Sequence, residues 1–93
     1  MDQLITTIIK RDGRTTPFSV GKIELAIVKA NNETREFDFK EARRLSEIVR
    51  DILEKVVGIR KEPVTVEQVQ DTVEQVLMAG GHFNTAKAYI LYR

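Results

Sequence analysis

The chain of 93 residues contains no cysteine and only one histidine, His82. Without cysteine the protein can form no disulfide, no catalytic thiolate and no zinc site with thiolate ligands, and one histidine cannot build a multi-histidine metal centre. A serine or cysteine triad needs an activating base, but His82 follows Gly80-Gly81 with no nucleophile motif around it. We therefore expect no metal site, a structural role for His82, and a chain that is not an enzyme by itself.

Long apolar runs and an excess of one charge are also missing. No apolar run approaches the roughly 20 residues needed to cross a bilayer, and the acidic, polar start at residues 1–3 differs from the basic start of a signal peptide. The 15 basic and 14 acidic residues give a net charge of +1, so bulk charge points to no particular partner. We expect a cytoplasmic protein that contacts no membrane.

The length limits the number of domains. A chain of this size can bury roughly 60–70% of its unfolded surface, enough for one core but not for a core plus a separate catalytic domain. No repeat, linker or low-complexity stretch divides the sequence. We expect one domain over residues 1–93.

The start of the chain has the pattern of a β-hairpin. β-Branched residues are frequent in residues 4–11, and Asp-Gly at residues 12–13 favours a two-residue hairpin turn. A return strand at residues 14–18 is expected to pair with the first, with Pro17 at its edge or end because proline cannot donate a ladder hydrogen bond. Residues 63–64 are expected to add a short third strand.

The rest of the sequence predicts four helices. Apolar residues recur at helical spacing in each segment, with polar capping residues before them and asparagine or glycine after the first three. The fold class is therefore α+β. The expected starts are Ser19, Asp38, Thr65 and Asn84, and the expected ends are Asn31-Asn32, Gly58, Gly80-Gly81 and Arg93.

Basic residues gather around the predicted hairpin and the first helix. Lys22 falls in the first turn of that helix, where free backbone N–H groups and the positive end of the helix dipole favour an anion. Strand alternation places Lys10 and Arg11 on opposite faces, so both reach one phosphate group only if the strand twists sharply at the turn. Spacing alone leaves two interpretations open, a polyphosphate site and a solvated basic hairpin tip. The four cations are Lys10, Arg11, Arg14 and Lys22.

Both ends of the sequence resemble the ATP-cone family. The similarity lies in Ile9-Lys10-Arg11-Asp12-Gly13-Arg14, Pro17-Phe18-Ser19, Lys22-Ile23 with Ala26-Ile27, and Ala86-Lys87-Ala88-Tyr89-Ile90-Leu91-Tyr92-Arg93. It spans nearly the whole chain, and the two ends lie at the right separation with a Thr-capped helix between them. The resemblance implies a three-stranded sheet that covers a four-helix bundle, with ATP or dATP, together with magnesium, held between the hairpin and the helices.

The resemblance also implies which residues bind the nucleotide. Lys10 and Arg11 match the basic pair that contacts phosphates in the family, and Lys22 matches the helix lysine that joins them. For Phe18 and Thr65 the alternative is plain packing or helix capping. The other matched positions border the base and sugar or lie near the nucleotide: Ile8, Thr16, Phe18, Ser19 and Thr65.

The closing helix, with Tyr89 and Tyr92, looks most like cones at the N-terminus of anaerobic glycyl-radical or cobalamin-dependent ribonucleotide reductases. The resemblance implies an allosteric domain in deoxyribonucleotide biosynthesis that senses ATP and dATP and regulates overall activity through oligomeric state. Its partners would be the rest of the reductase polypeptide and, where cones self-associate, a second cone.

The sequence leaves three alternatives. The same kind of cone follows a zinc ribbon in nucleotide-dependent transcriptional repressors, which the absence of cysteine disfavours. A cone joined to a small-molecule kinase is a second alternative. The third is a nucleic-acid-binding helical domain, but the near-zero net charge and the interleaved acidic residues at 41–55 argue against it, so we expect no nucleic-acid partner.

Overall fold

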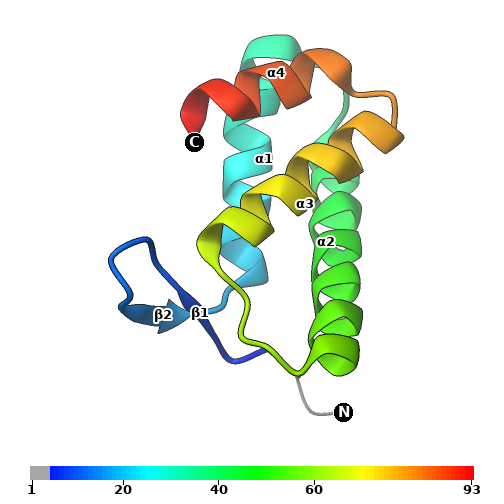
Figure 1. Cartoon of the computed structure of the whole chain (residues 1–93). Helices are drawn as coiled ribbons and strands as arrows, with labels where there is room; N and C mark the ends of the chain where they lie inside the picture. Colours follow the sequence, from blue (N-terminus) through cyan, green and yellow to red (C-terminus); the bar gives the residue numbers. More distant parts are fainter. Residues whose placement is uncertain (1–4) are drawn as a thin grey trace.

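The computed structural model describes residues 5–93, in which a small hairpin precedes and packs beside a group of helices (Figure 1). The α+β class predicted from the sequence is confirmed. Leu4, the expected start of the first strand, lies outside the described residues. The elements are β1 (Thr7–Ile9), β2 (Thr15–Pro17), α1 (Val20–Thr34), α2 (Phe39–Arg60), α3 (Val66–Ala79) and α4 (Phe83–Tyr92).

The hairpin has a longer turn than expected. β1 and β2 pair antiparallel, and the pairing continues to Lys10, whose amide donates to the Arg14 carbonyl at 2.7 Å. The Gly13 amide donates to the Lys10 carbonyl at 2.9 Å, so the loop holds residues 11–13 and the predicted two-residue turn is wrong. Gly13 has φ of 88°, the left-handed conformation that closes a three-residue hairpin loop and that glycine adopts without strain.

The third strand expected around Val64 is not formed among residues 5–93, where the sheet has two strands. The Ile9 amide donates to the Val64 carbonyl at 2.9 Å, and one isolated parallel bridge joins Ile9 to Thr65. Thr65 is the N-cap of α3, and its amide donates to the Gln68 side chain, so the chain turns into the helix directly after this bridge. This short contact still fixes the hairpin beside the start of α3.

Three helix starts follow the predicted capping residues. Ser19, Asp38 and Thr65 have extended backbone, and each side chain accepts a hydrogen bond from an amide in the first turn of α1, α2 or α3. Thr65 and Gln68 form a reciprocal capping box, which satisfies two amides at once. The predicted end of α3 is also confirmed, because Gly80 is its C-cap and Gly81 follows with φ of 81°.

Two predicted helix ends are wrong. Asn31-Asn32 and Gly58 lie inside α1 and α2, and each helix instead ends where Arg35 or Lys61 adopts a left-handed backbone with φ of 54° or 60°. The Asn31 side chain does not break the helix, because it hydrogen-bonds the backbone of the loop that follows, including the Phe37 carbonyl at 2.6 Å. A glycine inside a helix costs only about 0.5–1 kcal/mol, which a long amphipathic helix tolerates.

The core lies among the four helices of the described chain. α1 packs against α2 and α4, and α3 packs against the same two helices. None of the helices within residues 5–93 is both long and apolar enough to span a membrane. The largest fully buried hydrophobic side chains are Ile27, Leu45, Val49, Val73 and Leu77.

Candidate functional site

A hollow of about 170 Å³ lies between the hairpin and the start of α1. Ile8 and Thr16 face each other across the two strands and contribute to its wall. Side chains two residues apart on a strand share a face, so Lys10 lies at a position on the same side of the hairpin as Ile8. The structure thus brings most of the predicted site residues to one place. Those that line the hollow are Ile8, Thr16, Phe18, Ser19 and Lys22.

The N-terminus of α1 forms the positive side of this hollow. Ser19 Oγ accepts a hydrogen bond from the Lys22 amide at 3.3 Å, and the first turn of α1 contains no acidic residue. None of the ion pairs within residues 5–93 uses Lys10 or Lys22. The helix dipole and two exposed lysines are therefore not neutralised by ion pairing, which favours an anion there.

Arg11 and Thr65 lie outside the hollow. Arg11 Nε is 3.1 Å from Glu67 Oε1 in the first turn of α3, and its side chain is 71% exposed. Thr65 Oγ1 accepts a hydrogen bond from the Gln68 amide at 3.2 Å, so capping accounts for this threonine in the present structure. The bridge between Thr65 and Ile9 nevertheless holds the start of α3 next to the hairpin.

Sequence reasoning missed several residues of the wall, above all Val69 and Tyr89. Both are buried, and their helical spacing is that of ordinary core residues, so the sequence alone could not separate wall from core. Burial, and then the nearby Asp71 carboxylate, raise the pKa of Tyr89 to about 12, which keeps its hydroxyl uncharged. The missed wall residues are Pro17, Ile23, Ala26, Val69 and Tyr89.

A second hollow, of about 340 Å³, adjoins the first and shares Lys22 and Ala26 with it. Lys29 and Tyr92 complete its polar lining, and the Tyr92 hydroxyl donates to the Glu33 carboxylate at 3.2 Å. Small-molecule sites usually measure about 300–1,000 Å³. The two hollows together have the size of such a site, whereas the first alone does not, and Lys22 lies where they meet.

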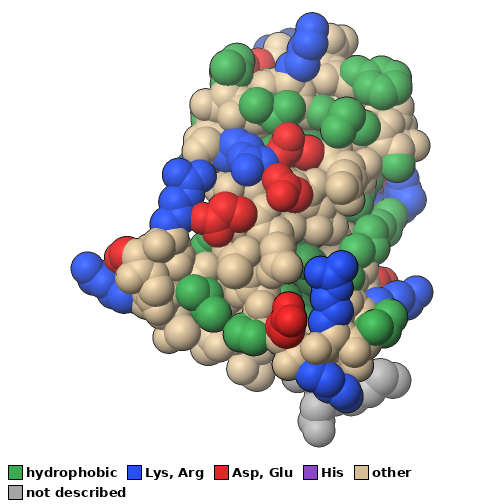
Figure 2. Space-filling view, in the orientation of Figure 1, with side chains coloured by type: hydrophobic (Ala, Val, Ile, Leu, Met, Phe, Trp, Pro, Cys, Tyr) green, Lys and Arg blue, Asp and Glu red, His purple; other side chains and the backbone are tan. Residues whose placement is uncertain are grey.

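The surface that includes the hairpin, α3 and α4 is shown in Figure 2. On this face basic and acidic side chains are interspersed, and hydrophobic side chains gather over α4 (Figure 2). Phe83 and Leu91 of α4 are 62% and 87% exposed. Nucleic-acid-binding proteins carry a continuous basic patch or stripe, which this face does not show.

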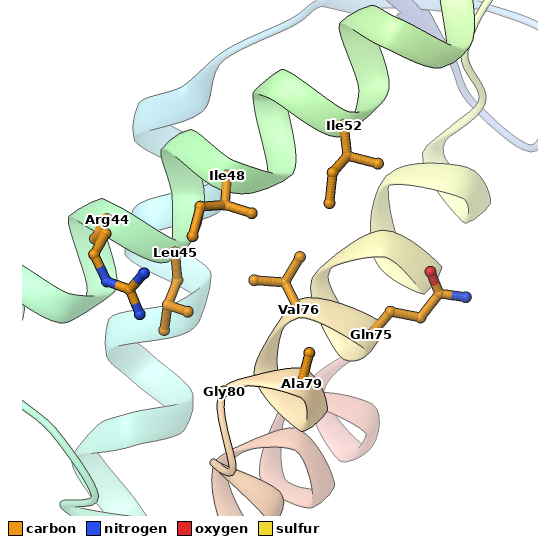
Figure 3. Close-up of a pocket in the computed structure, with 8 residues that line it drawn as sticks. All are labelled: Arg44, Leu45, Ile48, Ile52, Gln75, Val76, Ala79 and Gly80. Carbon is orange, nitrogen blue, oxygen red and sulfur yellow. The ribbon is translucent and has the colours of Figure 1, made fainter.

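A further hollow, of about 360 Å³, lies between α2 and α3 (Figure 3). Figure 3 shows Ile48, Ile52 and Val76 directed into the space between the two helices. Its cation, Arg44, is bound to both carboxylate oxygens of Glu41 at 2.6 and 2.7 Å. The rest of the lining is uncharged, and two hydrogen bonds hold Arg44 on Glu41, so this groove suits a polyphosphate poorly.

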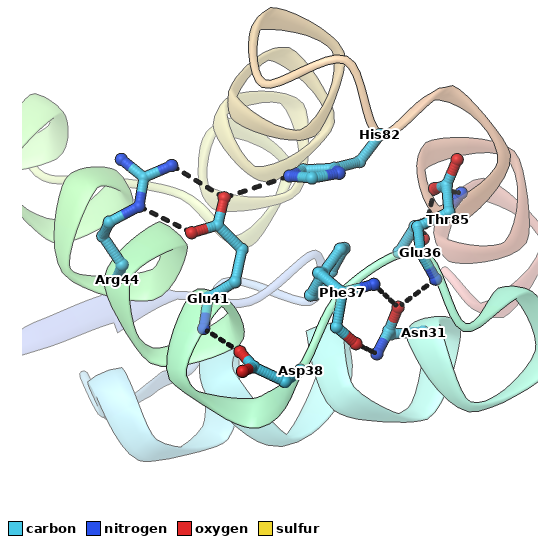
Figure 4. A network of polar contacts seen from close by, with 8 residues as sticks. All are labelled: Asn31, Glu36, Phe37, Asp38, Glu41, Arg44, His82 and Thr85. Carbon is cyan, nitrogen blue, oxygen red and sulfur yellow. Dashed lines mark hydrogen bonds and ion pairs between the residues drawn. The ribbon is translucent and has the colours of Figure 1, made fainter.

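Polar contacts join the start of α2 to the loop between α3 and α4 (Figure 4). The Glu41 carboxylate contacts Arg44 and lies 3.1 Å from His82 Nε2, while the His82 ring packs on Phe37 with centroids 4.4 Å apart. The hydrogen bond from Arg44, and then the one from His82, lower the pKa of Glu41 to about 2. His82 thus packs and hydrogen-bonds within this network. Within residues 5–93 no group of three or more potential metal ligands forms.

A second acid in this network, Glu36, serves as the cap of α4. His82 occupies the N-cap position without a side-chain cap hydrogen bond. Glu36 instead accepts hydrogen bonds from the Thr85 amide at 2.7 Å and the Thr85 hydroxyl at 2.6 Å. Desolvation raises the pKa of Glu36, but the hydrogen bonds from Thr85 and Asn84 outweigh it and lower the pKa below its ordinary value.

Comparison with known proteins places these features in a family context. Residues 6–93 match the family model described as ATP cone domain. The chain is 40% identical to a vitamin B12-dependent ribonucleoside-diphosphate reductase of Thermoplasma acidophilum, over 97% of this chain and 12% of that protein. It is 37% identical to a ribonucleoside-diphosphate reductase subunit alpha of Chlamydia muridarum, over 94% of this chain and 9% of that protein. An anaerobic ribonucleoside-triphosphate reductase of Escherichia coli is 30% identical over 92% of this chain and 11% of its own length. The chain thus spans about a tenth of the length of these relatives.

Proposed function

The chain belongs to the ATP-cone family, and on this premise we propose that it is an allosteric domain that senses ATP and dATP for a ribonucleotide reductase. The match over residues 6–93 and the reductase relatives support the proposal. B12-dependent and anaerobic enzymes are both among these relatives, in line with the host classes inferred from the closing helix. Reduction itself uses cysteine chemistry in these classes, and this chain has no cysteine.

The observation that carries the proposal is the pair of hollows at the capped start of α1, which Lys22 lines. Neither Lys22 nor Lys10 makes an ion pair within residues 5–93. The phosphates would lie near Lys10 and Lys22, because backbone N–H groups and the dipole at a helix N-terminus attract anions. The base and sugar would pack against the apolar wall that includes Ile8 and Phe18. The nucleotide would bring its own magnesium ion, which its phosphates would hold.

Calorimetric titration of residues 1–93 with ATP, dATP and inorganic triphosphate tests this function. We expect ATP and dATP to bind and to raise the melting temperature, since a ligand at a hundredfold excess over Kd stabilises the native state by about 2.7 kcal/mol. Parallel titrations with Mg²⁺ and with EDTA show whether the metal takes part. Absence of binding and of a thermal shift at millimolar ATP would rule the function out, and equal effects of triphosphate would show that the base is not recognised.

A further inference from the structure

Arg11 differs from the other two matched cations because it already has an anionic partner. Its Nε donates to Glu67 Oε1 at 3.1 Å, whereas Lys10 and Lys22 make no ion pair within residues 5–93. Glu67 lies in the first turn of α3, two residues after Thr65. The two partners are 56 residues apart in the sequence, so the pair links the hairpin tip to a helix that begins far away in the chain.

We propose that Glu67 competes with the nucleotide phosphates for Arg11 and thereby limits nucleotide affinity. The inference rests on the proposed function, because it needs a phosphate within reach of the hairpin tip. The Arg11 and Glu67 side chains are 71% and 39% exposed, and ion pairs this exposed are weak and screened by salt. A phosphate group carries more charge and offers several oxygens to a guanidinium, so it replaces Glu67 when it binds.

The exchange also reaches α3. The hairpin contacts the start of this helix through the Ile9 amide and the Val64 carbonyl, and the Arg11–Glu67 pair is a second link close by. Once Arg11 turns to a phosphate, Glu67 stays next to the positive end of the α3 dipole, so the helix keeps its start. α3 packs against α2 and α4. Nucleotide binding therefore loosens one link between the hairpin and the helices without unfolding either.

A double-mutant cycle tests the competition. ATP affinity is measured by calorimetry at low ionic strength for the wild type, Glu67→Gln, Arg11→Ala and the double variant. We expect Glu67→Gln to tighten binding about two- to fivefold, the range that corresponds to an exposed ion pair. The gain should disappear when Arg11 is already alanine, because no arginine is then left to release. Glutamine is a good helix former, so the variant keeps α3, as a far-ultraviolet spectrum can verify.

Asp71→Asn is the matched control, because Asp71 lies one turn further along α3 and pairs with Arg93 at 3.0 Å. It removes the same charge from the same helix and should change affinity less than Glu67→Gln. The inference is overturned if Glu67→Gln binds ATP like the wild type, or if its gain persists undiminished without Arg11, which would indicate a general charge effect. In either case ATP binding by the wild type would leave the proposed function standing. A wild type that does not bind ATP would overturn both.

Discussion

Among single residues, Lys22 is the side chain on which the proposed nucleotide site would depend most, because it borders both hollows and lies in the first turn of α1. A charge-assisted contact contributes about 1.5–3 kcal/mol, so we expect Lys22→Ala to weaken ATP binding roughly 10- to 150-fold. Calorimetry measures the change. Lys55→Ala is a suitable control, since Lys55 is an exposed lysine that borders neither hollow. Unchanged affinity in a folded Lys22→Ala protein would remove Lys22 from the site.

Glu41 predicts a pH dependence of stability. Its pKa is lowered from 4.5 to about 2, first by the hydrogen bond from Arg44 and then by the one from His82. A group with a lowered folded-state pKa stabilises the native state above its unfolded-state pKa, and this contribution is lost as the pH falls through the folded-state value. We expect Glu41 to contribute roughly 2 kcal/mol that disappears between about pH 5 and pH 2, after allowance for solvent screening.

Urea denaturation of the wild type and Glu41→Gln across this pH range measures the effect. The two unfolding free energies should differ near neutral pH and converge toward pH 2. Asp51→Asn serves as the comparison, because it removes an exposed carboxylate from the same helix. Parallel pH profiles of the wild type and Glu41→Gln would show that the network around His82 does not stabilise the fold in this way.

At this scale the sequence could predict several residues that line the candidate site but not all of their pairings. Lys22 follows from local capping, because its place in the first turn depends only on Ser19 three residues earlier. The partner of Arg11 depends on the bridge between the hairpin and Thr65, which no local pattern reveals. Tyr89 could not be assigned to the wall either, because a buried residue on a helix stripe looks the same whether it faces a hollow or the core.

Among the elements, the helix starts were predicted better than the helix ends, for a physical reason. A serine, threonine or aspartate cap acts on amides within its own first turn, so the sequence carries the information locally. The ends of α1 and α2 depend instead on Arg35 and Lys61, which adopt positive φ although neither is glycine or asparagine. The loop contacts of Asn31 help to decide where α1 ends, and such contacts are tertiary.

The cap of α4 is also tertiary and leads to a prediction. Glu36 accepts hydrogen bonds from the amides of Asn84 and Thr85 at 3.4 and 2.7 Å. Glu36→Ala leaves these amides and the Thr85 hydroxyl without this acceptor, so we expect a loss of about 1–3 kcal/mol in unfolding free energy. Urea denaturation measures it, with Glu33→Ala as the control, since the exposed Glu33 accepts one side-chain hydrogen bond within residues 5–93, from the Tyr92 hydroxyl at 3.2 Å. Equal losses in both variants would contradict the capping role.

At the scale of the whole molecule, an allosteric domain influences a reaction by shifting a conformational or assembly equilibrium. A ligand shifts such an equilibrium only if it binds the two states with different affinity. ATP and dATP differ by one ribose hydroxyl, which can supply about 0.5–1.5 kcal/mol through one neutral hydrogen bond. The bias from one domain is therefore small, and several domains in one oligomer would be needed to multiply it.

We therefore expect the full-length host enzyme, in which this chain would form one small part, to change oligomeric state between ATP and dATP, while the isolated domain responds only weakly. Gel filtration with light scattering of the full-length enzyme, with and without residues 1–93, measures the masses. The switch should disappear when the domain is removed. Lys22→Ala in the full-length enzyme should shift the switch to higher nucleotide concentration, because weaker binding needs more ligand to reach the same occupancy. If the enzyme has the same mass with ATP and with dATP, or if the switch survives deletion of the domain, regulation through assembly by this domain is refuted. A bound nucleotide would then act through a conformational change within one oligomer.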